Sequence, residues 1–260
     1  MGRDNYGVFP LKGKVMNVRD ATEKQCSENE EIQNLVRILG LKSGCDWSVN
    51  CRYGKEYKDT SSLRYGHLLI MTDQDYDGSH IKGLVLNLFE TFWPSLLKLD
   101  FVSQFITPIV KVTRKKEEHT FFTVKEFQDW SSKEKDLKSW KIKYFVSVSS
   151  LMYRYYKGLG TSTAKEGKEY FSNLPRHVLP FAPLTASESN LIDMCFKRSR
   201  CEERKEWIDG FDPESYIDYG SIWKSVLMFR EESCADLRFH QQGIDSVFAP
   251  GLHSIDSEYD

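Results

Sequence analysis

The chain has 260 residues, of which 40% are hydrophobic and 13% aromatic, enough apolar material for one or two domains with a sizeable core. A net charge of −2 excludes a strongly basic protein, so any contact with nucleic acid must depend on local patches. The six cysteines form no C-x-x-C pair, which argues against a disulfide scaffold or zinc site and favours reduced, intracellular thiols.

The sequence contains no segment typical of export or of membrane insertion. The first ten residues lack a basic region followed by an apolar one. The most apolar stretch, residues 84–99, is interrupted by Asn87, Glu90 and Pro94. We therefore expect an intracellular protein without a membrane partner.

Helical and strand-like patterns alternate along the chain, which predicts an α/β protein. The segment 67–71 is a short apolar run of the kind found in buried parallel strands, and residues 81–97 carry apolar side chains at helical spacing. The other predicted elements are an extended segment at 8–18, a helix within 21–39 that ends at Gly40, a loop at 43–62, strands at 105–112 and 120–124 around a charged turn at 114–118, a short helix at 125–130, a glycine-containing loop at 157–163 and a helix at 164–171.

An acidic cluster stands between the predicted strand at 67–71 and the helix that follows it. Asp73, Asp75 and Asp77 precede Gly78 and form the pattern D-x-D-x-D-G. Three carboxylates so close together repel one another unless a cation or solvent screens them. Ligands of α/β sheets collect at the carboxyl ends of strands, so the position suits a binding site.

Four interpretations of this cluster remain open from the residues alone. A calcium loop of the EF-hand kind needs a glutamate at its twelfth position, where this chain has Leu84. A phosphatase-like D-x-D pair would use the first aspartate as nucleophile, and no other feature supports it. The cluster could also be a solvated turn, or hold Mg²⁺ beside a phosphodiester.

The longer string MTDQDYDGSHIKG at residues 71–83 closely resembles the TOPRIM signature of eukaryotic type IIA DNA topoisomerases. Five more blocks follow the order of that family: GRDNYGVFPLKGKVMNVR at 2–19, WPSLL at 93–97, FITPIVKV at 105–112, YKGLGTST at 156–163 and RKEW at 204–207. Six collinear blocks make chance similarity very improbable.

The resemblance implies specific roles for individual residues. Asp73, Asp75 and Asp77 would hold Mg²⁺, and the partner would be double-stranded DNA in the nucleus. Lysine and arginine neutralise phosphate, and asparagine can donate a hydrogen bond to it. The implied DNA contacts are Lys14, Asn17, Lys157, Arg204 and Lys205. His80 fits a structural hydrogen-bonding role better than a catalytic one.

The chain departs from the family pattern in several places. The upstream E-G-D-S-A motif is not present, and no nucleotide-cradling loop replaces the ATP-binding domain of the family. Residues 145–155 form an 11-residue insert in a sequence that the family keeps continuous. No Arg-Tyr pair follows residue 210, so we name no catalytic residue and expect the isolated chain to be inactive.

The expected fold is a TOPRIM-type, Rossmann-like parallel sheet flanked by helices, incomplete at its N-terminus and followed by a mostly helical or irregular extension. The predicted divisions are a TOPRIM domain at 1–175, a helical link at 176–209 and a divergent tail at 210–260. Two functions remain open. The chain is either part of an enzyme that passes one duplex through another with ATP and Mg²⁺, or an inactive paralogue that binds DNA or a topoisomerase. Association with itself or with a full-length topoisomerase II is compatible with both.

Overall fold

A computed structural model describes residues 4–42, 56–73, 76–122, 124–144 and 162–210 of the chain. The predicted insert at 145–155 and the tail from residue 211 lie outside these residues. The helices and strands, in chain order, are α1 (Glu23–Glu28), α2 (Glu30–Leu39), β1 (Leu68–Met71), α3 (Tyr76–Phe92), η1 (Leu96–Lys98), β2 (Val102–Phe105), β3 (Val110–Arg114), β4 (Glu117–Phe121), α4 (Val124–Lys133), η2 (Leu137–Ser139), β5 (Lys141–Tyr144), α5 (Ala164–Ser172), η4 (Leu174–Arg176), β6 (Val178–Pro180), α6 (Ala186–Phe196), η5 (Arg198–Arg200) and α7 (Cys201–Asp209).

The strands form two small sheets, so the predicted mixture of helices and strands is confirmed. The first sheet has the order β1-β2-β6, in which β1 and β2 are parallel and β6 is antiparallel to β2. The second has the order β4-β3-β5 and is antiparallel throughout. In the described part of the chain both sheets are therefore small and only the first contains a parallel pair, so a wholly parallel Rossmann-like sheet is not confirmed.

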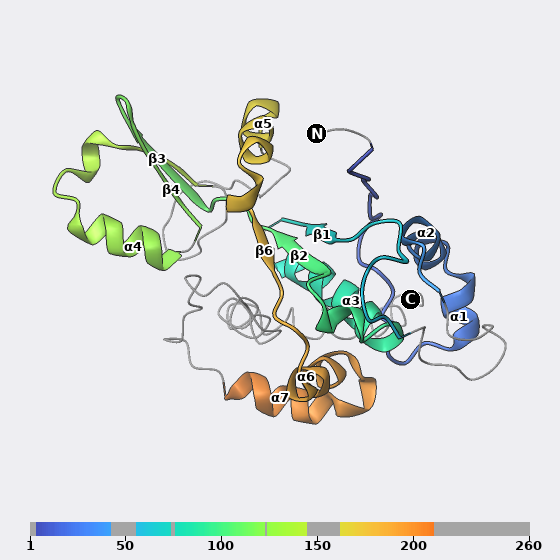
Figure 1. Cartoon of the computed structure of the whole chain (residues 1–260). Coiled ribbons are helices and arrows are strands. Elements are labelled where there is room, and N and C mark those ends of the chain that lie inside the picture. The colour runs from blue at the N-terminus through green and yellow to red at the C-terminus, as the bar shows by residue number, and fades with distance from the viewer. Residues whose placement is uncertain (1–3, 43–55, 74–75, 123, 145–161, 211–260) are drawn as a thin grey trace, which may run out of the picture.

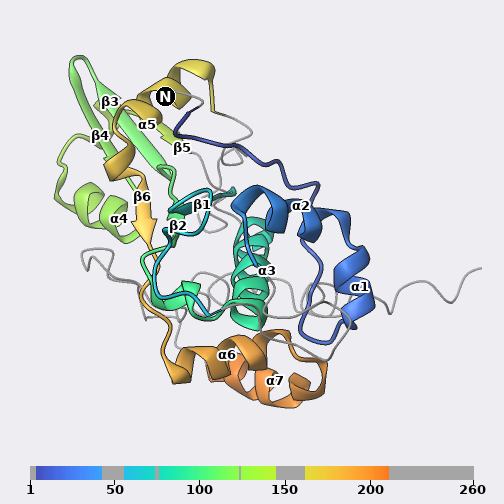
Figure 2. The same cartoon turned by 45° about the vertical axis from the view of Figure 1, so that its right-hand side comes forward.

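The first sheet and helix α3 lie at the centre of the molecule, with α1 and α2 on one side and α6 and α7 below (Figures 1 and 2). Strand β2 is buried along its whole length, as expected for a central strand. Phe89 of α3 and Trp93 just after it are almost completely buried, and Phe89 packs against both Trp93 and Phe101, which precedes β2. Truncating a buried aromatic residue of this kind costs about 3–5 kcal/mol.

The second sheet has an aromatic core of its own and extends away from the first (Figure 1). Val110 and Val112 of β3 are buried beneath α4, together with Phe121 and Phe127. Trp140 also belongs to this core, and the guanidinium carbon of Arg114 lies 4.2 Å from its ring centre. Such a contact adds about 0.5–1 kcal/mol at an exposed site.

Several predicted boundaries are confirmed and others are wrong. The strand at 67–71 is β1, and Gly40 ends α2 in the left-handed conformation at φ 73°. The single helix within 21–39 is instead two helices, because Asn29 ends α1 and its side chain then caps α2 by accepting from the Ile32 N–H.

The predicted strand at 105–112 also proved to be two strands, β2 and β3, which belong to different sheets. Pro108 lies between them and has no N–H to donate to a strand neighbour. None of the described helices is long and apolar enough to cross a membrane.

Candidate metal and nucleic-acid site

The acidic loop occupies the turn between β1 and α3, at the carboxyl end of β1. Asp73 follows the strand closely, whereas Asp77 lies in the first turn of α3. Asp75 lies outside the described residues. A negative side chain in the first turn also favours the helix electrostatically, because free N–H groups gather at that end.

Gly78, near the start of α3, allows the helix to begin close to the backbone of Asp73. A Cβ atom at this position would lie 2.0 Å from the backbone oxygen of Asp73, far inside van der Waals contact. The obstacle is backbone, so a side chain could not be accommodated by rotation of a neighbour. The glycine that ends the D-x-D-x-D-G pattern therefore brings the start of α3 against Asp73.

Asp77 is paired with a cation of the N-terminal segment. The Lys14 Nζ atom lies 3.0 Å from the Asp77 Oδ1 atom. The two side chains are 43% and 72% exposed, so water can compete for both. The contact connects two residues to which the family resemblance assigns different partners, a phosphate and a metal ion.

His80 lies one turn further along α3 and is largely buried, with its ring stacked 6.5 Å from that of Phe196. Burial, and after it the charge of Lys14, lowers the pKa of His80 from 6.5 to about 4, although the Asp77 carboxylate acts in the opposite direction. The imidazole is therefore neutral at pH 7, in keeping with its predicted structural role.

Carboxylate oxygens are the ligands that Mg²⁺ prefers, and two carboxylates completed by water make a common protein site. Asp73 and Asp77 supply this chemistry at one loop, and Asp77 already pairs with a positive charge. Among the described residues no group of three acidic, histidine or cysteine side chains is close enough to hold a metal. The fit to Mg²⁺ therefore rests on the type of donor and on the fold of the loop.

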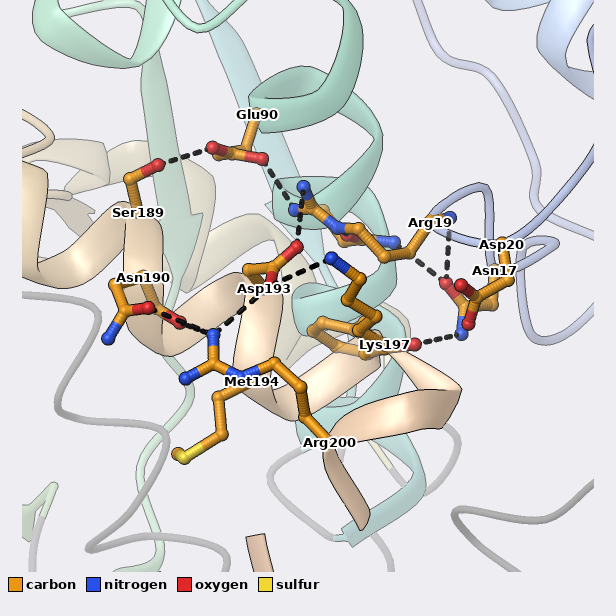
Figure 3. A network of polar contacts seen from close by, with 12 residues as sticks. Asn17, Arg19, Asp20, Glu90, Ser189, Asn190, Asp193, Met194, Lys197 and Arg200 are labelled. Carbon is orange, nitrogen blue, oxygen red and sulfur yellow. Dashed lines mark hydrogen bonds and ion pairs between the residues drawn. The ribbon is translucent and has the colours of Figure 1, made fainter. Parts of the chain in front are cut away.

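A polar network holds the N-terminal segment against α3 and α6 (Figure 3). Arg19 is at its centre, with Nε 3.0 Å from the Asn87 Oδ1 atom and Nη2 2.5 Å from the Glu90 Oε2 atom. Ser189 of α6 donates to the other Glu90 oxygen at 2.5 Å, and Asp193 lies 3.6 Å from Arg19 Nη1. Asn87 and Glu90 are buried.

The same network uses the side chain of Asn17. Its amide nitrogen donates to the Phe196 carbonyl oxygen at 2.8 Å, at the end of α6. Its oxygen accepts from the Arg19 N–H at 3.1 Å and from the Asn87 amide at 3.0 Å. Asn17 therefore acts here as an internal connector between three segments.

Arg200 extends the network along the loop between α6 and α7 (Figure 3). It donates to Asp193 Oδ2 at 3.1 Å and pairs with Glu203 at 2.6 Å. Hydrogen bonds from Arg200 to these two carboxylates raise the pKa of Arg200, and the bond to Glu203 has the larger effect. Conversely, the Arg200 guanidinium lowers the pKa of the Glu203 carboxyl.

Arg204 and Lys205 are neighbours with different surroundings. Arg204 is buried, and its Nη1 atom donates to the carbonyl oxygens of Met194 at 2.6 Å and Lys197 at 3.2 Å. It thereby satisfies oxygens that the end of α6 leaves without helical partners. Lys205 is exposed and pairs with Glu202 at 3.0 Å.

Comparison with known proteins gives the same family from sequence and from structure. Residues 105–229 match the family described as the C-terminal associated domain of TOPRIM. DNA topoisomerase 2-alpha of Gallus gallus is 48% identical over 81% of this chain and 12% of the relative. DNA topoisomerase 2 of Plasmodium falciparum is 49% identical over 84% of this chain and 14% of the relative. This chain is a relative of eukaryotic DNA topoisomerase II.

A solved structure extends the relationship to three dimensions. The crystal structure of the Plasmodium falciparum topoisomerase II DNA-binding, cleavage and re-ligation domain superposes with a TM-score of 0.77 at 45% identity. The match covers 94% of this chain and 30% of that one. The chain spans about an eighth of the length of the curated topoisomerase II relatives it matches.

The topoisomerase II resemblance assigned metal and DNA contacts, and the structure brings only some of these residues together. Lys14 and Asp77 are in contact, and Asn17 lies on the same N-terminal segment. Asn17 and Arg204 make internal contacts, which leaves Lys14 and Lys205 as the more accessible members of the predicted DNA set. Lys157 lies outside the described residues.

Sequence reasoning missed the residues that hold this site together. Asn87 and Glu90 stand within the most apolar helix, where they served only to exclude a membrane span. The same helix contains the buried Lys82, which donates to Gln104 of β2 at 3.1 Å. Buried polar groups need hydrogen-bonding partners. Polar residues within an apolar helical pattern therefore indicated that partners such as Arg19 and Gln104 must lie elsewhere in the chain.

Proposed function

We propose that this chain supplies the metal-binding TOPRIM region of a type II DNA topoisomerase and binds Mg²⁺ and double-stranded DNA. The observation that carries the proposal is the position of Asp73 after the carboxyl end of β1, close to Gly78 at the start of α3. The parallel pairing of β1 with β2 is compatible with a TOPRIM-type sheet. Similarity to the topoisomerase II relatives favours this interpretation over a calcium loop or a phosphatase.

Within this proposal the residues have separate roles. Asp73, Asp75 and Asp77 would hold Mg²⁺ through carboxylate oxygens, with water completing the coordination. The bound ion would neutralise charge on a phosphodiester during strand breakage and rejoining. Lys14 and Lys205 would contact phosphates, which fixes the position of a duplex without reading its sequence. ATP would act through a part of the whole enzyme other than these residues.

The proposed assembly and location follow from the same relationship. We propose association of the chain with a second copy or with full-length topoisomerase II, and a nuclear location where duplex DNA is present. Analytical ultracentrifugation tests the first, and a fluorescent fusion tests the second. A chain that stays monomeric and does not bind full-length topoisomerase II would contradict the proposed association. A fusion excluded from nuclei would contradict the proposed location.

Calorimetric titration of Mg²⁺ into the full chain tests the metal site. The Asp73→Asn, Asp77→Asn variant should lose the heat of binding. Asp100→Asn is a matched control, because this exposed carboxylate precedes β2 at the opposite, amino end of the parallel β1–β2 pair. Equal heats for all three proteins would show that the loop is only a solvated turn.

Duplex binding and strand cleavage test the nucleic-acid part of the proposal. The chain should bind a short duplex more weakly as salt increases, because phosphate contacts release counterions. Binding of DNA and metal without cleavage would identify a binding module. Failure to bind duplex at low salt would contradict the proposal.

A further inference from the structure

The Lys14–Asp77 ion pair joins the predicted phosphate contact to the predicted metal loop. Lys14 Nζ lies 3.0 Å from Asp77 Oδ1, and both side chains keep access to water. Lys14 belongs to the segment that the Arg19 network fixes against α3, whose first turn carries Asp77. The two residues are thus held near each other by buried structure while their charged ends remain exchangeable.

A divalent cation on Asp77 changes the balance of this ion pair. A metal ion and an ammonium beside one carboxylate repel each other, and the metal neutralises the charge that attracts Lys14. An ammonium has three donors, so Lys14 could contact a carboxylate and a phosphate together, and the change in charge drives the exchange without any steric exclusion. Metal binding should therefore loosen Lys14 from Asp77 and favour its pairing with a phosphate.

We propose that Lys14 exchanges between Asp77 and a DNA phosphate, so that divalent metal and duplex DNA bind this chain cooperatively. The inference rests on the proposed function, because it needs both ligands. Binding free energies are reciprocal, so DNA must tighten metal binding by the same factor by which metal tightens DNA binding. Without ligands, Lys14 shields the acidic loop by taking the place of a cation.

The exposure of the pair limits the size of the effect. Exposed ion pairs change an equilibrium constant by no more than about fivefold. Exchange of the ion pair therefore requires little free energy, and the expected coupling factor is about two- to fivefold. Higher salt should reduce it, because both contacts are screened.

The chain offers a matched control for the charge of Lys14. Lys12 is two residues away and carries the same charge, but its Nζ atom lies 3.7 Å from Glu30 of α2, with both side chains highly exposed. Lys12→Gln therefore removes an equal charge from the same segment without touching the acidic loop. A difference between the two variants separates the contact from the general effect of charge.

The test measures Mn²⁺ binding to the full 260-residue chain by electron paramagnetic resonance, with and without a short duplex. A titration of the duplex alone is subtracted. Fluorescence anisotropy of the duplex, with and without Mn²⁺, gives the reciprocal factor. The proteins are the wild type, Lys14→Gln, Lys12→Gln and Asp77→Asn, and each is checked for folding by circular dichroism.

The wild type and Lys12→Gln should share a coupling factor of about two to five, whereas that of Lys14→Gln should fall to about one. Without DNA, Lys14→Gln should bind Mn²⁺ at least as tightly as the wild type. Two results would overturn this inference and leave the proposed function standing. In the first, both ligands bind and the coupling factor is the same in the wild type and Lys14→Gln. In the second, both lysine variants lose the coupling equally. Absence of Mn²⁺ or duplex binding would overturn the proposed function as well.

Discussion

Arg19 Nη2 lies 2.5 Å from Glu90 Oε2, and the two side chains are only 12% and 10% exposed. The negative charge of Glu90 is thereby balanced inside the molecule, and Ser189 donates a hydrogen bond to its second oxygen. Removing one partner of a buried pair leaves the other charged and poorly solvated. The contact joins the N-terminal segment to α3 and α6, three parts of the chain that are far apart in sequence.

Arg19→Met should therefore destabilise the protein strongly. We expect a loss of about 3–5 kcal/mol in the free energy of unfolding, measured by urea denaturation. Lys24→Gln is the control, since Lys24 pairs with Glu28 at 3.8 Å on the exposed surface of α1. That change should cost no more than about 0.5 kcal/mol. Similar losses for both variants would contradict the importance of the buried network.

Substitution of two glycines by alanine should have opposite effects on stability. Gly78→Ala would place a Cβ atom against the Asp73 backbone, so we expect a loss of about 1–3 kcal/mol or more and a weaker metal site. Gly167 lies within α5 with no atom near its hypothetical Cβ, so Gly167→Ala should stabilise by about 0.5–1 kcal/mol. Thermal unfolding of the two variants measures both changes, and a harmless Gly78→Ala would refute the close approach to Asp73.

The stability of the protein should fall as the pH is lowered through the range in which His80 titrates. Burial lowers the folded-state pKa of His80 from 6.5 to about 4, so between these values the unfolded state binds more protons. The loss should reach roughly 3 kcal/mol near pH 4, because each pKa unit corresponds to about 1.4 kcal/mol.

Urea denaturation at a series of pH values measures this slope, and His80→Gln should reduce it. Part of the slope should remain, because burial also lowers the pKa of His177. The same substitution at the exposed His67 controls for the loss of an imidazole. An unchanged slope in His80→Gln would show that His80 titrates normally in the folded protein.

Two neighbouring basic residues should affect DNA binding in different ways. Exposed Lys205 is suited to a direct phosphate contact, so Lys205→Ala should reduce the salt slope of duplex binding by about 0.9. Buried Arg204 holds the end of α6, so Arg204→Ala should lower the unfolding temperature and leave the salt slope unchanged. A reduced slope for Arg204→Ala, with normal stability, would instead identify a direct contact.

The sequence by itself was sufficient for the parts of this protein that depend on local pattern. The apolar run before Asp73 and the helical spacing after it predicted β1 and α3, because burial imposes a period on neighbouring side chains. Gly40 predicted the end of α2, because a left-handed residue there favours glycine. The collinear blocks of residues were enough to indicate the topoisomerase II family.

Only the tertiary structure decided which polar residues are internal and which are accessible. Asn17 and Arg204 look like surface DNA contacts in sequence, but each satisfies carbonyl oxygens at the end of α6. Arg19 pairs with Glu90, which is 71 positions away in the chain, and the local spacing of residues does not predict such a partner. Packing brings these groups together, and the free-energy cost of burying an unpaired charge then determines their contacts.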